Sequence, residues 1–155
     1  MIIISKKVLF VCTGNTCRSS MAEVLFQDLL EKNNLDNYDV ESAGIAAVDG
    51  KSAARQAIEV MKEEDLDLTT HQTSYLTVDL ITEADLILTM TQRHKLSILD
   101  AYPQVEDKIY TLKEYAATDN KGLDISDPFG QPLSVYKECA EEIKEELKKV
   151  IKKLD

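Results

Sequence analysis

Tryptophan is absent from this sequence of 155 residues, and glycine, proline and histidine are rare, with 5, 3 and 2 residues. No linker, internal repeat or low-complexity segment divides the chain, so we predict a single domain over residues 1–155 with a sizeable core. The two histidines, His71 and His94, have no Cys or carboxylate cluster at metal-ligand spacing. We therefore expect no metal ion and no cofactor.

A membrane-length apolar run and an excess of basic charge are also missing. Residues 1–7 (MIIISKK) are too short for a signal peptide, and no later stretch approaches a membrane span. The 18 Lys and Arg residues are outnumbered by 28 Asp and Glu, which gives a net charge of −10. No basic stripe would attract nucleic acid or an anionic membrane. We expect a cytoplasmic protein that binds neither.

Cysteine is scarce as well, with three residues. Three cysteines in a cytosolic chain predict reduced thiols and not a disulfide framework. Cys139 lies in the last predicted helix and is most simply a packing thiol. Cys12 and Cys17 differ from it because they share one loop.

Short apolar segments alternate along the chain with segments of helical periodicity. Strands are predicted at residues 7–11, 39–42, 84–90 and 108–112, helices at 18–32, 52–64, 77–83, 92–99 and from Pro132 onward, and a polar loop at 118–130. The alternation is typical of an α/β fold, in which helices cover both faces of a parallel sheet. Ligands of such folds bind beyond the carboxyl ends of the strands, where Cys12 follows the first strand.

The segment around Cys12 joins a predicted strand to a predicted helix through a short loop, residues 12–19 (CTGNTCRS). Backbone amides of such a loop can converge into an anion-binding nest, and the helix N-terminus adds partial positive charge. A thiol at this position is expected to ionise readily. We expect Arg18, at the end of this loop, to direct its guanidinium to the same anion-binding site, with N–H donors suited to phosphate oxygens. A buried core thiol is the alternative for Cys12, but the strand–loop–helix context favours a nucleophile.

Arg18 and Ser19 each have an ordinary structural explanation beside the functional one. A cation at a helix start is disfavoured by the helix dipole, and a bound phosphate would offset that cost. Ser19 could serve simply as a capping residue. In the functional interpretation its hydroxyl bonds the Cys12 sulfur and helps the sulfur to leave in a second step.

Phosphoryl transfer also requires an acid that protonates the leaving group. Asp127 is our candidate, because Pro128 restricts the residue before it and so stiffens the loop that carries the carboxylate. Asp-Pro also marks ordinary turns, and Asp124 is the rival. His71 is more simply a structural hydrogen-bonding residue in a connector.

With these residues identified, the chain resembles the low-molecular-weight protein tyrosine phosphatase family over essentially its whole length. The matching pieces are residues 11–19, 21–23, 42–44, 85–94, His71 and Asp127-Pro128. The resemblance implies a single-domain, three-layer αβα fold with a four-stranded parallel sheet, and a metal-free mechanism in two steps. Cys12 would form a phosphocysteine, and Asp127 would protonate the leaving group and then activate water. The residues implied in phosphate binding are Thr13, Gly14, Asn15, Thr16, Cys17 and Arg18, with Asn15 also holding the loop in shape.

One residue of the loop, Thr16, bears on which phosphorylated side chain is the substrate. Thr16 stands where tyrosine-specific members commonly carry an aliphatic residue, and the chain looks most like a bacterial branch that acts on phosphoarginine in proteins. We therefore predict a protein-arginine phosphatase, a monomer acting on phosphorylated proteins, with Thr16 and Phe129 setting specificity. A phosphotyrosine substrate is the close alternative. Arsenate reduction and a non-enzymatic phosphoprotein-binding module are less favoured, the former because only Cys139 lies beyond the loop to relay oxidation.

Two departures and one regulatory expectation complete the comparison with the family. Ser20 stands where the family usually has proline, which should loosen the loop slightly. Gln131-Pro132 replaces the glycine usually seen there, so the pocket shape on that side is open. Cys17 could trap an oxidised Cys12 as a disulfide and so act as a reversible off switch, or it could be only a small buried loop residue.

Overall fold

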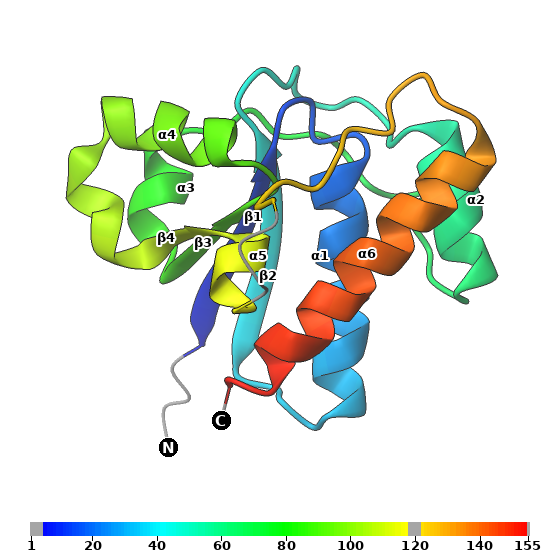
Figure 1. Ribbon diagram of the computed structural model, residues 1–155, viewed down its shortest axis with the longest axis horizontal. Helices are drawn as coiled ribbons and strands as arrows, with labels where there is room; N and C mark the ends of the chain where they lie inside the picture. The colour runs from blue at the N-terminus through cyan, green and yellow to red at the C-terminus, as the bar shows by residue number, and fades with distance from the viewer. Residues whose placement is uncertain (1–4, 118–121, 155) are drawn as a thin grey trace.

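The computed structural model describes residues 5–117 and 122–154 and contains a four-stranded parallel sheet (Figure 1). The strand order is β2-β1-β3-β4. The strands are β1 Lys6–Cys12, β2 Tyr38–Gly44, β3 Leu86–Thr89 and β4 Ile109–Thr111. The predicted fold class is confirmed. The predicted polar loop lies partly outside the described residues, at 118–121, as do residues 1–4 and 155 of the predicted domain.

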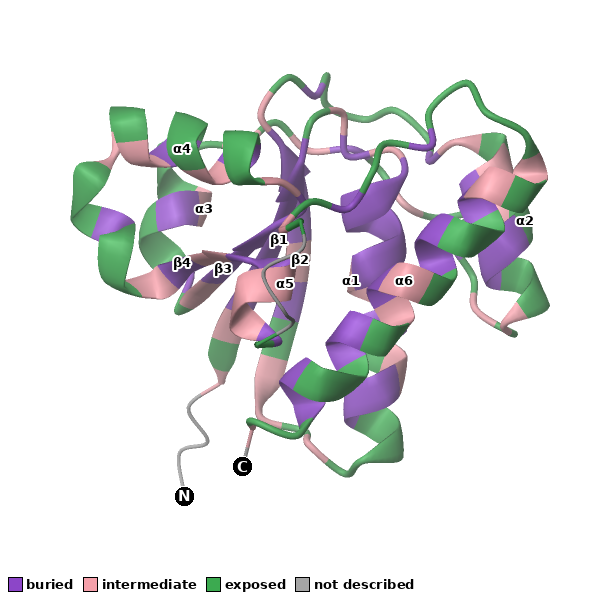
Figure 2. Ribbon diagram, viewed as in Figure 1, coloured by how far each residue is buried: buried purple, intermediate pink, exposed green. Residues whose placement is uncertain are grey.

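Helices cover both faces of this sheet, with α1 and α6 on one side and α3 and α4 on the other (Figure 1). Their bounds are α1 Arg18–Lys32, α2 Arg55–Glu63, α3 Val78–Glu83, α4 Gln92–Ala101, α5 Leu112–Tyr115 and α6 Leu133–Ile151, with a 3-10 helix η1 at Pro103–Lys108. Figure 2 shows the buried strands enclosed between these helices. Within the described residues, no helix is long and apolar enough to cross a membrane.

The alternation of β1 side chains directs Cys12 toward one face of the sheet. Val8, Phe10 and Cys12 belong to the core on the α1 and α6 side. Leu9 and Val11 belong to the core on the α3 side, as the two-residue period of a strand requires. The nucleophile candidate therefore faces α1, whose first turn follows it in sequence.

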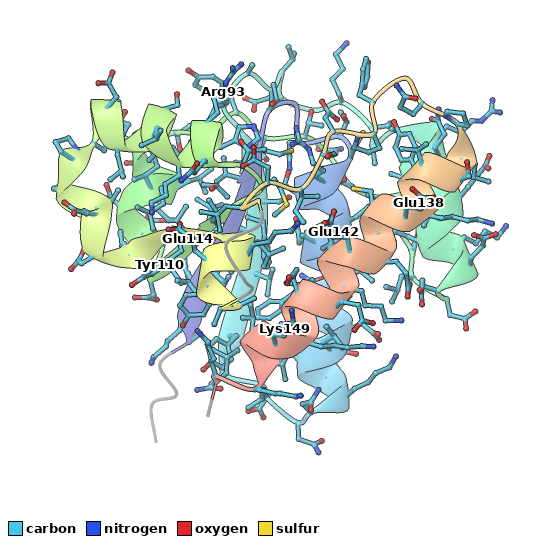
Figure 3. All side chains as sticks on the ribbon, in the orientation of Figure 1. Arg93, Tyr110, Glu114, Glu138, Glu142 and Lys149 are labelled. Atoms are coloured by element: carbon cyan, nitrogen blue, oxygen red, sulfur yellow. The ribbon has the colours of Figure 1, made fainter. Side chains whose placement is uncertain are left out.

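Ion pairs connect α5 with a helix on each side of it. Lys95 of α4 lies 2.9 Å from Glu114 of α5, and Lys113 of α5 lies 2.6 Å from Glu142 of α6. Glu114 and Glu142 are labelled in Figure 3. Thr111 and Glu114 also form a capping box at the start of α5. These contacts hold α5 and α6 in place. Asp127 lies in the segment that connects these two helices in sequence.

Several predicted element bounds differ from those in the structure. The second helix begins at Arg55 and not at 52, because Ala54 donates its amide to Thr16 O at 2.9 Å while Lys51 binds Thr73. The third strand is shorter than 84–90 and the fourth shorter than 108–112. Pro132 does not open the last helix as a helical residue but precedes it as the N-cap, with extended backbone.

Candidate active site

The cysteine loop, residues 12–18, directs its carbonyl groups toward the rest of the protein. The carbonyls of Cys12 and Thr13 accept from Ile45 N and Ala46 N at 3.0 and 2.9 Å. Within the described residues, the amides of 13–17 donate to no protein acceptor, so this loop presents free N–H groups. A concave array of free amides at a helix N-terminus is an anion-binding arrangement.

Gly44, at the end of β2, allows the cysteine loop to pack directly against that strand. A Cβ atom at that position would lie 2.5 Å from Thr13 O and 2.9 Å from Asn15 N. Any side chain would therefore push the cysteine loop away from β2, and glycine is required there on steric grounds.

Asn15 holds the shape of the loop from beneath. It is fully buried and has a left-handed backbone, with φ at 60°. Its Nδ2 donates to Ser19 Oγ at 2.8 Å and to Ser42 Oγ at 2.9 Å, and its Oδ1 accepts from Ser74 N at 2.9 Å. Its carbonyl accepts from His71 Nε2 at 2.8 Å, so His71 takes the structural part expected of it.

Ser19 links this network to the sulfur of Cys12. Ser19 Oγ lies 2.9 Å from Cys12 Sγ. Asn15 donates to the same oxygen, so the Ser19 hydroxyl proton has two acceptors within reach, Ala43 O at 3.5 Å and Cys12 Sγ at the shorter distance of 2.9 Å. A hydroxyl that donates to sulfur stabilises negative charge on it.

Arg18 joins the cysteine loop to the segment that carries the acid candidate. Its side chain is buried, with 5% exposed, and Nη1 donates to Ile125 O at 2.9 Å. Nη2 lies 3.5 Å from Asp127 Oδ2, on a carboxylate that is 50% exposed. Ile125 is held in turn by Met90, because its amide donates to Met90 O at 2.8 Å, just beyond β3.

The two rival carboxylates occupy different positions. Asp127 lines the pocket above Cys12, and its Oδ1 accepts from Phe129 N at 3.1 Å, which keeps the loop turned. Asp124 Oδ1 accepts from Gln92 N at 2.8 Å, at the start of α4. Asp124 therefore binds the first turn of α4, whereas Asp127 lies in the pocket with Cys12, and Asp127 stays our candidate for the acid.

A pocket of about 320 Å³ unites most of the predicted site residues. Its lining consists of Cys12, Thr13, Gly14, Thr16, Cys17, Arg18, Asp127 and Phe129. Asn15 and Ser19 lie behind the loop, where they support it. Phe129 is 71% exposed and stands at the mouth as an apolar wall.

The other two cysteines are held as thiols. Cys17 Sγ lies 3.4 Å from the hydroxyl of the buried Tyr136, and burial raises the pKa of the Cys17 thiol. Burial also raises the pKa of Cys139 to about 12. Ser20 is buried too, and its hydroxyl donates to Cys17 O at 2.9 Å, which adds a side-chain contact that the usual proline would lack.

His94 is a site residue whose role the sequence did not reveal. It is 3% exposed, its Nε2 lies 2.9 Å from Thr13 Oγ1, and its Nδ1 lies 3.0 Å from Thr91 Oγ1. Burial, with help from nearby Arg18 and Arg93 and against the opposing effect of Asp124 and Asp127, lowers the pKa of His94 to about 4. The available signal was Thr91, a typical N-cap residue that places His94 on the first turn of α4.

Comparison with known proteins gives a consistent result. The model of the low molecular weight phosphotyrosine protein phosphatase family matches residues 7–155. A protein-arginine-phosphatase of Bacillus subtilis is 43% identical over 147 residues, covering 95% of each chain.

Two solved structures extend the comparison. One is a Cys-to-Ser variant of the YwlE arginine phosphatase with a phosphorylated active-site serine, 40% identical with a TM-score of 0.89, covering 96% of this chain and 95% of that one. The other is a low molecular weight protein tyrosine phosphatase from T. tengcongensis, 42% identical with a TM-score of 0.90, covering 97% and 100%.

Proposed function

This chain belongs to the low-molecular-weight phosphotyrosine protein phosphatase family, and we propose that it hydrolyses phosphoarginine in proteins through a phosphocysteine at Cys12. The observation that carries the substrate assignment is the presence of two polar side chains, Thr16 and Asp127, in the lining of the pocket. Thr16 and Asp127 line the same cavity as Cys12, so a hydroxyl and a carboxylate face the group that enters. A guanidinium is a cation with several donors, and these side chains can accept from it.

In the first step, Cys12 Sγ attacks phosphorus while the bond from phosphorus to the arginine nitrogen breaks. Asp127 supplies the proton that the leaving nitrogen takes up, so arginine departs as the neutral or protonated guanidine and phosphorus remains on sulfur. The amides of the cysteine loop and the Arg18 guanidinium bind the equatorial oxygens. Positioning and charge stabilisation of this kind account for most of the catalysis in phosphoryl transfer.

In the second step, a water molecule attacks phosphorus and the sulfur–phosphorus bond breaks. Asp127, now ionised, accepts the proton of the water, which returns the carboxylic acid for the next cycle. Ser19 donates to the departing sulfur of Cys12 from 2.9 Å. The phosphorylated active-site serine of the related Cys-to-Ser variant supports a covalent intermediate at the corresponding position.

Phosphotyrosine is the second candidate substrate, and Phe129 favours it. Its ring stands at the pocket mouth with 71% exposed, where it could pack on an aromatic leaving group. The T. tengcongensis tyrosine phosphatase is also about as similar to this chain, at 42% identity, as the arginine phosphatase relatives are.

The decisive experiment compares kcat/KM on phosphoarginine and phosphotyrosine forms of one peptide, for the wild type and Thr16→Ile. We expect the wild type to favour phosphoarginine and Thr16→Ile to shift the ratio at least tenfold toward phosphotyrosine, roughly the effect of one lost hydrogen bond. Thr82→Ile is the matched control, because Thr82 is exposed on α3 outside the pocket. An unchanged ratio in Thr16→Ile would reject the role of Thr16, and a wild type that prefers phosphotyrosine would reject the substrate.

We further infer a cytoplasmic monomer. The pocket lining of one chain already includes Cys12, Arg18 and Asp127, so the proposed reaction requires no residue from a partner. Cys12, Cys17 and Cys139 are free thiols, which a reducing compartment would maintain. Size-exclusion chromatography with light scattering tests the monomer, and a stable dimer at micromolar concentration contradicts it.

A further inference from the structure

Thr13 and His94 form a contact that connects α4 with the cysteine loop. Thr13 Oγ1 lies 2.9 Å from His94 Nε2, although the two residues are 81 positions apart in sequence. Thr13 is exposed and lines the pocket beside Cys12. His94 is 3% exposed and lies behind Thr13. A buried imidazole therefore holds a hydroxyl that a substrate can reach.

The hydrogen bonds of Thr91 determine which ring nitrogen of His94 carries the proton. Thr91 Oγ1 accepts from the backbone amide of His94 at 3.1 Å and lies 3.0 Å from His94 Nδ1. If the Thr91 hydroxyl donates to Nδ1, its oxygen both donates and accepts, and Nε2 carries the ring proton. In the other tautomer the Thr91 oxygen would accept two hydrogen bonds, and among the described residues no acceptor would remain for the Thr91 hydroxyl proton. We assign the Nε2–H form.

This tautomer leaves the Thr13 hydroxyl proton unused by the protein. His94 Nε2–H donates to Thr13 Oγ1, which occupies that oxygen as an acceptor. The hydroxyl proton of Thr13 then turns away from the ring, toward the pocket that the residue lines. Burial keeps the imidazole neutral, because it lowers the pKa of His94 to about 4. The order of donors runs from Thr91 through His94 to Thr13.

We propose that His94 is a positioning residue that directs the Thr13 hydroxyl to donate to an oxygen of the transferring phosphoryl group. The proposal rests on the phosphatase site described above and adds a side-chain donor to the loop amides and Arg18. Negative charge on the equatorial oxygens is what phosphoryl-transfer sites stabilise. An oriented hydroxyl contributes without reorganising, whereas a freely rotating hydroxyl in water does not.

The test is a double-mutant cycle with Thr13→Val and His94→Leu, measured with p-nitrophenyl phosphate. Thr13→Val should lower kcat/KM about tenfold, the effect of one hydrogen bond to a charged oxygen. The same variant should raise the Ki of vanadate by the same factor, while the urea midpoint falls only modestly, because the one hydrogen bond to His94 is lost. Thr13→Ser, which keeps the hydroxyl, should recover most of the lost activity. His94→Leu should cost a similar factor alone and almost nothing further in the Thr13→Val background.

Two outcomes would overturn the proposal. Thr13→Val with wild-type kcat/KM would show that the hydroxyl does not bind the phosphoryl group. An equal cost of His94→Leu with threonine and with valine at position 13 would show that His94 acts elsewhere. If His94→Leu fails to fold, His94→Gln keeps an amide donor near the Nε2 position and should retain more activity than His94→Ala. Because these rates use an aryl phosphate, they decide the role of Thr13 whether or not phosphoarginine proves to be the substrate.

Discussion

Replacing Asn15 with alanine should destabilise the protein and disorder the cysteine loop, because the hydrogen bonds that support this loop are lost. The change removes three side-chain hydrogen bonds, to Ser19, Ser42 and the amide of Ser74. Each contributes about 1 kcal/mol net, and alanine at a left-handed φ of 60° costs about 1 kcal/mol more. We expect the free energy of unfolding to fall by about 4 kcal/mol. The kcat on p-nitrophenyl phosphate should fall as well, because Ser19 and the loop amides lose their fixed positions.

Asn34→Ala is the matched control for this change. Asn34 also has a left-handed backbone, with φ at 56°, but it is exposed and follows α1 away from the site. The free energy of unfolding of Asn34→Ala should fall only by the cost of alanine at a left-handed φ, about 1 kcal/mol, and its kcat should be unchanged. Urea denaturation and steady-state kinetics of both variants measure the difference. If Asn15→Ala costs no more stability than Asn34→Ala, the network beneath the cysteine loop does not stabilise the fold and our account of it is wrong.

Three further predictions concern individual side chains. Ser19→Ala should slow the breakdown of the phosphoenzyme about tenfold or more, so stopped-flow assays with p-nitrophenyl phosphate should show a larger burst; a smaller burst would contradict its role. After peroxide treatment, dithiothreitol should not restore the activity of Cys17→Ala, because Cys12 would lack a partner thiol to form a protective disulfide. Full recovery of activity would reject the proposed Cys12–Cys17 redox switch. The depressed pKa of His94 means that the folded form binds its proton less readily than the unfolded chain, so stability is lost as pH falls from 6.5 toward 4, by at most about 1.4 kcal/mol per pH unit. His94→Gln should show a smaller loss over that interval, and an equal loss would show that other groups cause it.

The sequence revealed those parts of the site that are contiguous. Cys12, Arg18 and Ser19 lie within one strand–loop–helix connection, where local geometry alone brings a thiol, a guanidinium and free amides together. Asp127 could be proposed because proline stiffens the residue before it. Its choice over Asp124 required the structure, since only the bond from Gln92 shows that Asp124 serves α4.

The contacts that the sequence did not reveal join distant segments. Thr13 meets His94 across 81 positions and Cys17 meets Tyr136 across 119, and no local pattern encodes such pairs. They follow from topology, because β3 lies beside β1 in the sheet and α6 packs against α1. Element ends were also misjudged where tertiary hydrogen bonds compete with helix formation, as at Ala54, whose amide binds the cysteine loop.

The most direct test of covalent phosphoryl transfer is a rapid-quench experiment with a protein that carries phosphoarginine. Quenching the first turnover with denaturant at mildly alkaline pH, which spares the acid-labile phosphorus–nitrogen bond of the substrate, followed by mass spectrometry of the peptide with Cys12, should find a phosphoryl group on Cys12 before free phosphate appears. The signal should decay as phosphate is released, and Cys12→Ser should not turn over. Release of phosphate with no phosphorylated Cys12, or turnover by Cys12→Ser, would contradict the mechanism.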